Sequence, residues 1–192
     1  MRIHGSKTIR RRDNIVPQND YSNYRRELRE DFCCICGYCG MHERVLHAKM
    51  EIDHFVPDRI DDERKNDYYN LIYACFQCNR KKRGCWPTEN KALHNDGTKG
   101  FVDPATQAYD DHLSRRDDGT IEALTDVGRY MFQTLRFDIR VTDIIWKASL
   151  LRELLDKLSA NINALSKEQQ EEHYRLFLEY DALDRFLFEK GE

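Results

Sequence analysis

Residues 36–82 decide the fold, because they hold two Cys-x-x-Cys pairs with a set of polar residues between and after them. The chain reads CGYCG at 36–40, DH at 53–54, NL at 70–71 and CFQCNRKK at 75–82. A Cys-x-x-Cys turn places two sulfurs on one metal ion, and two such turns complete the four ligands of a structural zinc site. The spacing predicts one zinc ion bound by Cys36, Cys39, Cys75 and Cys78.

The chain has seven cysteines, so three are left over, and Cys33 forms a competing Cys-x-x-Cys pair with Cys36. Two unrelated cysteine turns, or a redox motif, are the alternatives to zinc. The odd count and the absence of an apolar N-terminal run argue against a disulfide scaffold. No stretch reaches the roughly 20 apolar residues that a membrane span needs. These features predict a cytoplasmic protein without a membrane segment.

The charge of the chain is divided unevenly between its two halves. Its 192 residues carry a formal net charge of −3, but residues 1–90 hold 17 Lys/Arg against 14 Asp/Glu, and residues 91–192 hold 14 against 20. Basic residues gather at 10–12, 25–26 and 80–83. Such clusters can neutralise phosphates. The third cluster is expected to contact nucleic acid through Arg80, Lys81, Lys82 and Arg83.

The pattern around the two cysteine pairs predicts a strand, a loop, a second strand and a helix. The strands fall at 47–54 and 71–74, residues 55–69 read as a loop, and a helix over 76–83 is expected to stop at Gly84. The fold class is therefore α+β, with a zinc-stabilised core and a mainly helical C-terminal extension. We divide the chain into a basic N-terminal arm with a lead-in helix (1–31), the core (32–90), and a hairpin plus helical extension (91–192).

The extension shows helix signals rather than chemistry. A β-hairpin is expected over 110–124, and Thr125 and Thr142 are expected to cap two helices. Apolar residues then alternate in steps of four and three from Ile144 to Leu165, which predicts a heptad seam. Ser166 and Gln169 form a capping box for a last helix. The two long helices would pair as an antiparallel hairpin, which either packs internally or binds a second copy or a partner protein.

The polar residues between and beside the cysteines suit phosphodiester hydrolysis. A neutral imidazole at His54 can take a proton from water near neutral pH. Asp53 and Asn79 offer hard oxygen ligands, which favour Mg²⁺ or Mn²⁺. A catalytic divalent ion separate from the zinc is therefore expected.

With these motifs, residues 32–84 resemble the HNH endonuclease superfamily, whose core is a ββα-metal unit. The resemblance implies that Asp53 binds the catalytic metal, His54 is the general base and Asn70 braces the loop. Asn79 stands where many members have histidine, as in an HNN variant, and Lys82 matches a phosphate contact. The implied activity is DNA cleavage; the alternative is a non-catalytic zinc-ribbon module that binds nucleic acid or protein. The architecture also resembles effector subunits of bacterial anti-phage systems, some paired with an ATPase.

Overall fold

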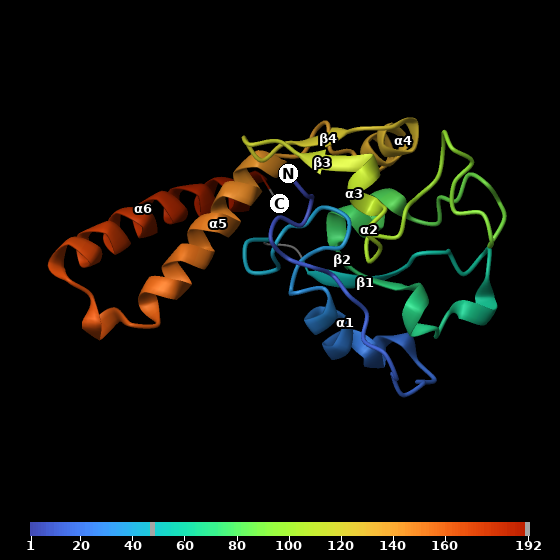
Figure 1. The fold of residues 1–192 in the computed structure, drawn as a ribbon, viewed down its shortest axis with the longest axis horizontal. Helices are drawn as coiled ribbons and strands as arrows, with labels where there is room; N and C mark the ends of the chain where they lie inside the picture. Colours follow the sequence, from blue (N-terminus) through green and yellow to red (C-terminus); the bar gives the residue numbers. More distant parts are fainter. Residues whose placement is uncertain (47–48, 191–192) are drawn as a thin grey trace.

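The centre of the molecule is a short antiparallel hairpin followed directly by a helix. The structure is a computed structural model that describes residues 1–46 and 49–190. Strand β1 (Met50–His54) pairs with strand β2 (Leu71–Cys75), with Met50 opposite Cys75 and His54 opposite Leu71. Helix α2 (Phe76–Lys82) begins at the next residue (Figure 1). This ββα order confirms the predicted α+β core; residues 47 and 48 of the expected first strand lie outside the described residues.

Local chemistry explains where α2 begins and ends. Every residue of β2 is buried, so the strand carries the chain through the core. The Sγ atom of Cys75 accepts a hydrogen bond from the backbone N–H of Cys78 at 3.5 Å and caps the helix. The helix ends at Lys82, one residue before the predicted end, and the residue that stops it is Arg83 with φ 48° rather than Gly84.

The basic N-terminal arm lies packed on the core, with Ile3 and Ile9 buried. After the arm come η1 (Tyr21–Tyr24) and α1 (Arg25–Asp31), which lies on the other side of the sheet from α2 (Figure 1). The guanidinium of Arg11 donates two hydrogen bonds to Asp103, and Arg12 pairs with Asp31. Two arginines of the first basic cluster are therefore held in ion pairs and are not available to phosphate.

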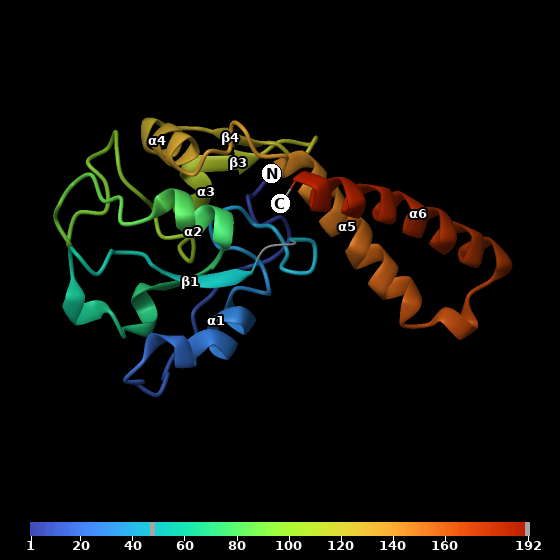
Figure 2. The same cartoon turned by 180° about the vertical axis from the view of Figure 1, so that it is seen from behind.

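Residues 55–141 complete the body of the protein. The loop after β1 contains η2 (Asp62–Arg64) and η3 (Tyr68–Asn70). Further on come α3 (Tyr109–His112), β3 (Leu113–Arg115), β4 (Ile121–Ala123) and α4 (Asp126–Thr134). Figure 2 shows β3, β4 and α4 as a layer beyond α2. Thr125 caps α4 as predicted, by accepting from the N–H of Gly128, whereas the start of the expected β-hairpin is the short helix α3.

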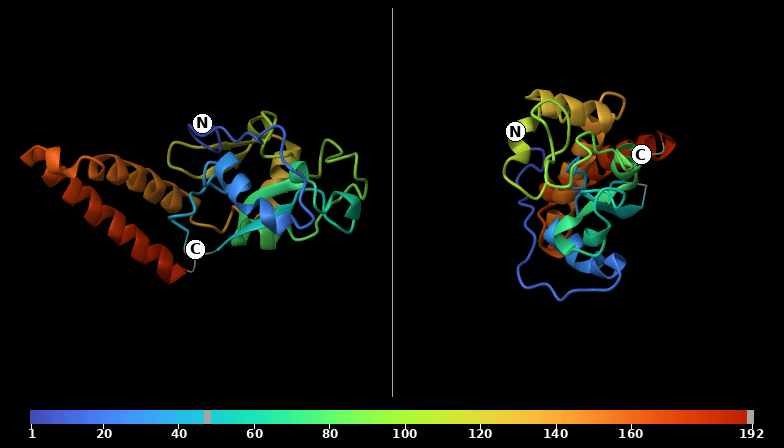
Figure 3. Two further views of the ribbon diagram at one scale, coloured as in Figure 1. Left: turned by 90° about the horizontal axis from the view of Figure 1, so that it is seen from below. Right: turned by 90° about the vertical axis from the view of Figure 1, so that its right-hand side faces the viewer.

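The C-terminal hairpin extends away from this body (Figure 3). It consists of α5 (Thr142–Ser159), η4 (Ile162–Ala164) and α6 (Lys167–Lys190). The Ser166–Gln169 capping box is confirmed by two reciprocal hydrogen bonds. Two other expectations are wrong: Thr142 is the first helical residue and not the cap, and the heptad seam stops where α5 ends. No helix in the described part of the chain could span a bilayer by its length and apolarity.

Candidate active site and metal centre

Four cysteines form one closed cluster. The Sγ atoms of Cys36, Cys39, Cys75 and Cys78 all lie within 4.8 Å of one another, and all four residues are buried. The Sγ atoms of Cys39 and Cys75 are 3.8 Å apart, and a tetrahedral zinc with bonds of about 2.3 Å separates its sulfurs by about 3.8 Å. The tetrad therefore fits a structural zinc ion. Cys33 is not part of the group, which removes the competing pair.

Two arginines from the extension support the cysteine cluster. Arg140 points both terminal nitrogens at it, with Nη1 3.2 Å from Cys78 Sγ and Nη2 3.9 Å from Cys75 Sγ. Arg115 is fully buried and donates to the carbonyl of Cys39 at 2.5 Å. Burial raises the pKa of the Cys36 and Cys78 thiols and thus disfavours their thiolates. A cation beside the cluster acts in the opposite direction and favours the thiolates that zinc requires. Neither arginine has a local sequence signal that predicts this contact.

A second, open site lies where β1 ends beside α2. A surface pocket here brings together carboxylates, an amide, an imidazole and arginines, and its lining consists of Glu51, Ile52, Asp53, His54, Pro57, Asp58, Arg59, Asn79, Arg80, Arg83 and Gly84. The predicted base His54 and the predicted metal ligands Asp53 and Asn79 are therefore neighbours in space. Their meeting follows from the register of β1 against β2 and the immediate start of α2.

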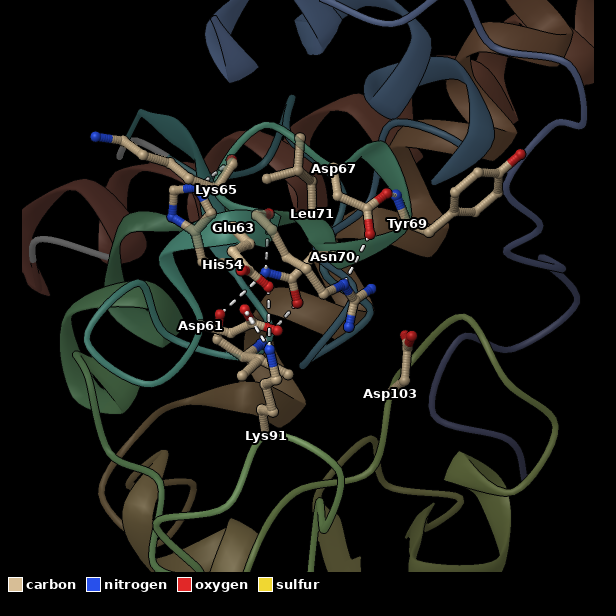
Figure 4. Close-up of polar contacts among 12 residues, drawn as sticks. His54, Asp61, Glu63, Lys65, Asp67, Tyr69, Asn70, Leu71, Lys91 and Asp103 are labelled. Carbon is tan, nitrogen blue, oxygen red and sulfur yellow. Dashed lines mark hydrogen bonds and ion pairs between the residues drawn. The ribbon is translucent and has the colours of Figure 1, made fainter.

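The orientation of His54 identifies its basic nitrogen. Its Nε2 atom lies 2.9 Å from the carbonyl oxygen of Lys65, and both residues appear in Figure 4. Because a carbonyl can only accept, Nε2 carries the hydrogen in the neutral ring, and Nδ1 keeps its lone pair. The geometry thus leaves Nδ1 as the atom that can take a proton.

Asp58 faces that nitrogen and was not identified from the sequence. Its Oδ1 atom lies 3.2 Å from His54 Nδ1, and in the described residues this buried oxygen has no hydrogen-bond partner. A carboxylate at this distance stabilises the ring once Nδ1 is protonated. The signal that would have found it is the four-residue spacing from His54 within a charged loop.

Asn70 fastens the loop that follows β1. It is fully buried, its Oδ1 accepts from the N–H of Val56 at 2.9 Å, and its Nδ2 donates to the carbonyl of Val56 at 3.0 Å. Figure 4 shows Asn70 central to this loop, near His54. The loop also carries Lys65, whose carbonyl orients His54. Asn70 thereby ties the start of the loop at Val56 to its end.

Asp53 is buried and held on one side. Its Oδ2 accepts from Tyr38 Oη at 2.5 Å and lies 2.9 Å from Lys82 Nζ. Burial raises the pKa of Asp53, and the charge of Lys82 and the hydrogen bond from Tyr38 oppose that effect. The structure corrects the expectation for Lys82, which is fully buried: its ammonium also donates to the carbonyl of His54 at 2.8 Å and does not reach surface phosphates.

Asn79 and Glu51 add further oxygen atoms to the lining of the pocket. Asn79 Nδ2 donates to Glu51 Oε2 at 2.6 Å, which leaves the amide Oδ1 for another partner. Glu51 has no motif of its own in the sequence, and two-residue alternation along β1 places it on the same side as Asp53. Carboxylate and amide oxygens suit a hard divalent cation, so this donor set fits one.

The exposed basic residues lie at the C-terminal end of α2. Arg80, Lys81 and Arg83 are exposed, and none of them forms an ion pair with a carboxylate of the described chain. The guanidinium of Arg80 lies 5.0 Å from the centre of the exposed Phe76 ring. Three of the four predicted phosphate contacts are therefore available at the surface beside the pocket.

Comparison with known proteins identifies the segment that holds both sites. Residues 36–84 match the family model described as HNH endonuclease. A search of curated proteins found no match, and neither did a search of solved structures. The matched segment begins at the first zinc ligand and contains the predicted catalytic residues as well as all four cysteines. Residues 36–84 of this chain are therefore similar to the HNH endonuclease family.

Proposed function

We propose that this protein is a metal-dependent endonuclease that hydrolyses DNA phosphodiester bonds in the pocket at the end of β1. One observation carries the proposal: His54 presents a lone-pair nitrogen beside a set of oxygen donors from Asp53 and Asn79. A base and a hard-cation site in one pocket are the two parts that metal-assisted hydrolysis needs. The HNH domain supports the same reaction.

Each of the pocket residues has a separate role in the proposed hydrolysis. Asp53 and Asn79 would hold Mg²⁺ or Mn²⁺, which supplies charge stabilisation at the phosphoryl and leaving oxygens when bound. His54 accepts the proton of the attacking water at Nδ1. Lys65 and Asn70 keep the ring in place, and the carboxylate of Asp58 stabilises the protonated imidazole.

A nucleic-acid substrate is supported by the basic end of α2, and DNA in particular is supported by the HNH endonuclease match alone. Arg80, Lys81 and Arg83 provide three cations beside the pocket. Lysine and arginine that neutralise phosphates bind without regard to sequence and release counterions. Cleavage of plasmid DNA in preference to an RNA of equal length is the expected outcome.

Chelation tests the proposal against the non-catalytic zinc-ribbon alternative. Purified protein is treated briefly with EDTA, its zinc content is measured, and supercoiled plasmid is added with or without Mg²⁺ or Mn²⁺. We expect cleavage to stop without added ion and to return with it, while one zinc per chain remains. A protein that retains zinc and binds plasmid, but never cleaves it with either ion, would be the zinc-ribbon module.

We further propose that the C-terminal hairpin binds a second copy or a partner protein, for example an ATPase as the resemblance in architecture implies. It carries exposed apolar side chains, among them Leu150, Leu154, Tyr174 and Phe177. Light scattering, followed by co-purification with the products of neighbouring genes, tests this proposal.

An anti-phage role is tested by phage challenge of cells that express the wild type or His54→Ala, where only the wild type should protect.

A further inference from the structure

The two carboxylate oxygens of Asp53 have different surroundings. Oδ2 receives two donors, the hydroxyl of Tyr38 at 2.5 Å and the ammonium of Lys82 at 2.9 Å. Oδ1 receives no hydrogen bond from the described residues, and Asp53 lines the pocket. The carboxylate is thus held by one oxygen while the other remains available to a ligand.

The residue that bonds to Asp53, Tyr38, belongs to the first cysteine turn. It lies between Cys36 and Cys39, and its side chain is fully buried. The backbone around it is fixed: the hydroxyl of Tyr109 donates to the carbonyl of Tyr38 at 2.7 Å, and the N–H of Gly37 donates to the carbonyl of Tyr73 at 2.8 Å. The phenol hydroxyl therefore has one position, and the fold of the first cysteine turn sets it.

We propose that Tyr38 is a positioning residue that orients Asp53 for the catalytic divalent ion and makes binding of that ion depend on the zinc-bound turn. The inference rests on the proposed function in one respect, namely that Asp53 is a ligand. Without the hydroxyl, Oδ2 keeps only the ammonium of Lys82, which also donates to the carbonyl of His54. The carboxylate can then rotate about its terminal torsion and present either oxygen. A hydroxyl that fixes Oδ2 keeps Oδ1 directed at the pocket, as partners of metal ligands commonly do.

The test is Tyr38→Phe, which removes only the hydroxyl, compared with Tyr68→Phe. Both tyrosines are buried and both donate one hydrogen bond to an aspartate, but Tyr38 bonds to Asp53 and Tyr68 bonds to Asp31. Binding of Mn²⁺ to the zinc-loaded proteins is measured without DNA by electron paramagnetic resonance. We expect Mn²⁺ to bind about 10–100-fold more weakly to Tyr38→Phe and with unchanged affinity to Tyr68→Phe.

Kinetics provide a second readout that general destabilisation would not mimic. The Mn²⁺ concentration for half-maximal cleavage by Tyr38→Phe should rise in step with its Kd. The rate at saturating Mn²⁺ should stay near that of the wild type, because His54 is untouched. A lower rate at saturation with an unchanged Mn²⁺ requirement would overturn the inference.

Asp53→Asn separates this inference from the proposed function. If Asp53→Asn binds Mn²⁺ as the wild type does, Asp53 is not a ligand and the proposed function fails. If Asp53→Asn binds weakly but Tyr38→Phe binds normally, only the positioning role of Tyr38 is wrong. If Tyr38→Phe loses its zinc, p-fluorophenylalanine, which fills the place of the hydroxyl but cannot donate, is placed at position 38. A weaker Mn²⁺ Kd with zinc retained supports the inference, and a wild-type Kd refutes it.

Discussion

The cysteine cluster and the pocket at the end of β1 lie next to each other and are built in opposite ways. In the cluster, four buried sulfurs face one another and leave no position for a further ligand. In the pocket, oxygen donors line a surface cavity beside a base. Metal sites that stabilise a fold are closed, whereas catalytic sites keep a position for water or substrate. The contrast shows that one short segment supplies two separate sets of metal donors: sulfurs that suit a structural ion, and oxygens that suit a catalytic one.

The division is sharpest at Cys78 and Asn79, which are consecutive in α2. Cys78 belongs to the closed cluster, and Asn79 forms part of the open pocket. Any change to the cluster therefore acts on the pocket, whereas a change to a pocket side chain can leave the cluster intact. The predictions below test this asymmetry.

Cys75→Ser should have the largest effect. Structural zinc contributes about 10–16 kcal/mol of apparent binding free energy in small zinc domains, so loss of one thiolate should abolish cooperative unfolding of the core. Thermal denaturation and elemental analysis give the measurement. Cys85→Ser, outside the cluster, is the control; a Cys75→Ser protein with wild-type melting would show that the cluster does not hold the fold.

His54→Ala should remove activity and leave the fold intact. A positioned base contributes about 10²–10⁴-fold to rate, so plasmid cleavage should fall by that factor while zinc content and Tm stay unchanged. His173→Ala, on the exposed hairpin, should cleave normally. Wild-type cleavage by His54→Ala would contradict the assignment of the base.

Arg140→Met should loosen the closed cluster from outside. Loss of an outer partner commonly weakens metal affinity by about 10–100-fold, so zinc should pass faster to a chromophoric chelator. Arg136→Met is the matched control, because Arg136 pairs with Asp138 at the surface. Equal zinc release from both variants would mean that Arg140 adds nothing to zinc retention.

Replacing the basic residues at the C-terminal end of α2 should have the smallest effect, and it should change only DNA binding. Arg80→Gln and Lys81→Gln should each lower the salt dependence of DNA binding by about one ion. Fluorescence anisotropy across a salt series measures the slope. Lys147→Gln, which removes an ion pair on the hairpin, should leave the slope unchanged; an unchanged slope in the α2 variants would place the DNA elsewhere.

Local features of the sequence predicted the parts of the fold that local chemistry determines. The spacing of the cysteines, the cap at Thr125 and the Ser166–Gln169 box involve residues a few positions apart or pairs with fixed ligand geometry. The heptad seam was predicted too long, because apolar spacing alone does not show that α5 ends at Ser159.

The sequence pattern did not predict which charged side chains are buried, or which residues far apart in the chain are in contact. Lys82 belongs to a basic run that looks exposed, and only the packed structure directs its ammonium to Asp53. Arg140 lies 62 residues from Cys78, and no spacing rule connects them. The bond from Tyr38 to Asp53 likewise depends on how the first cysteine turn lies against β1.

Helix α5 begins two residues after Arg140, and its 18 residues make a rod about 27 Å long. Ile145 and Ala148 fix its first turns in the core, and its far end lies out in the projecting hairpin. The other end of the hairpin is anchored as well, because Leu187 of α6 is fully buried in the same core. Because both ends are anchored and the two helices pack along each other, the hairpin holds its tip at residues 160–166 in a set position relative to the core.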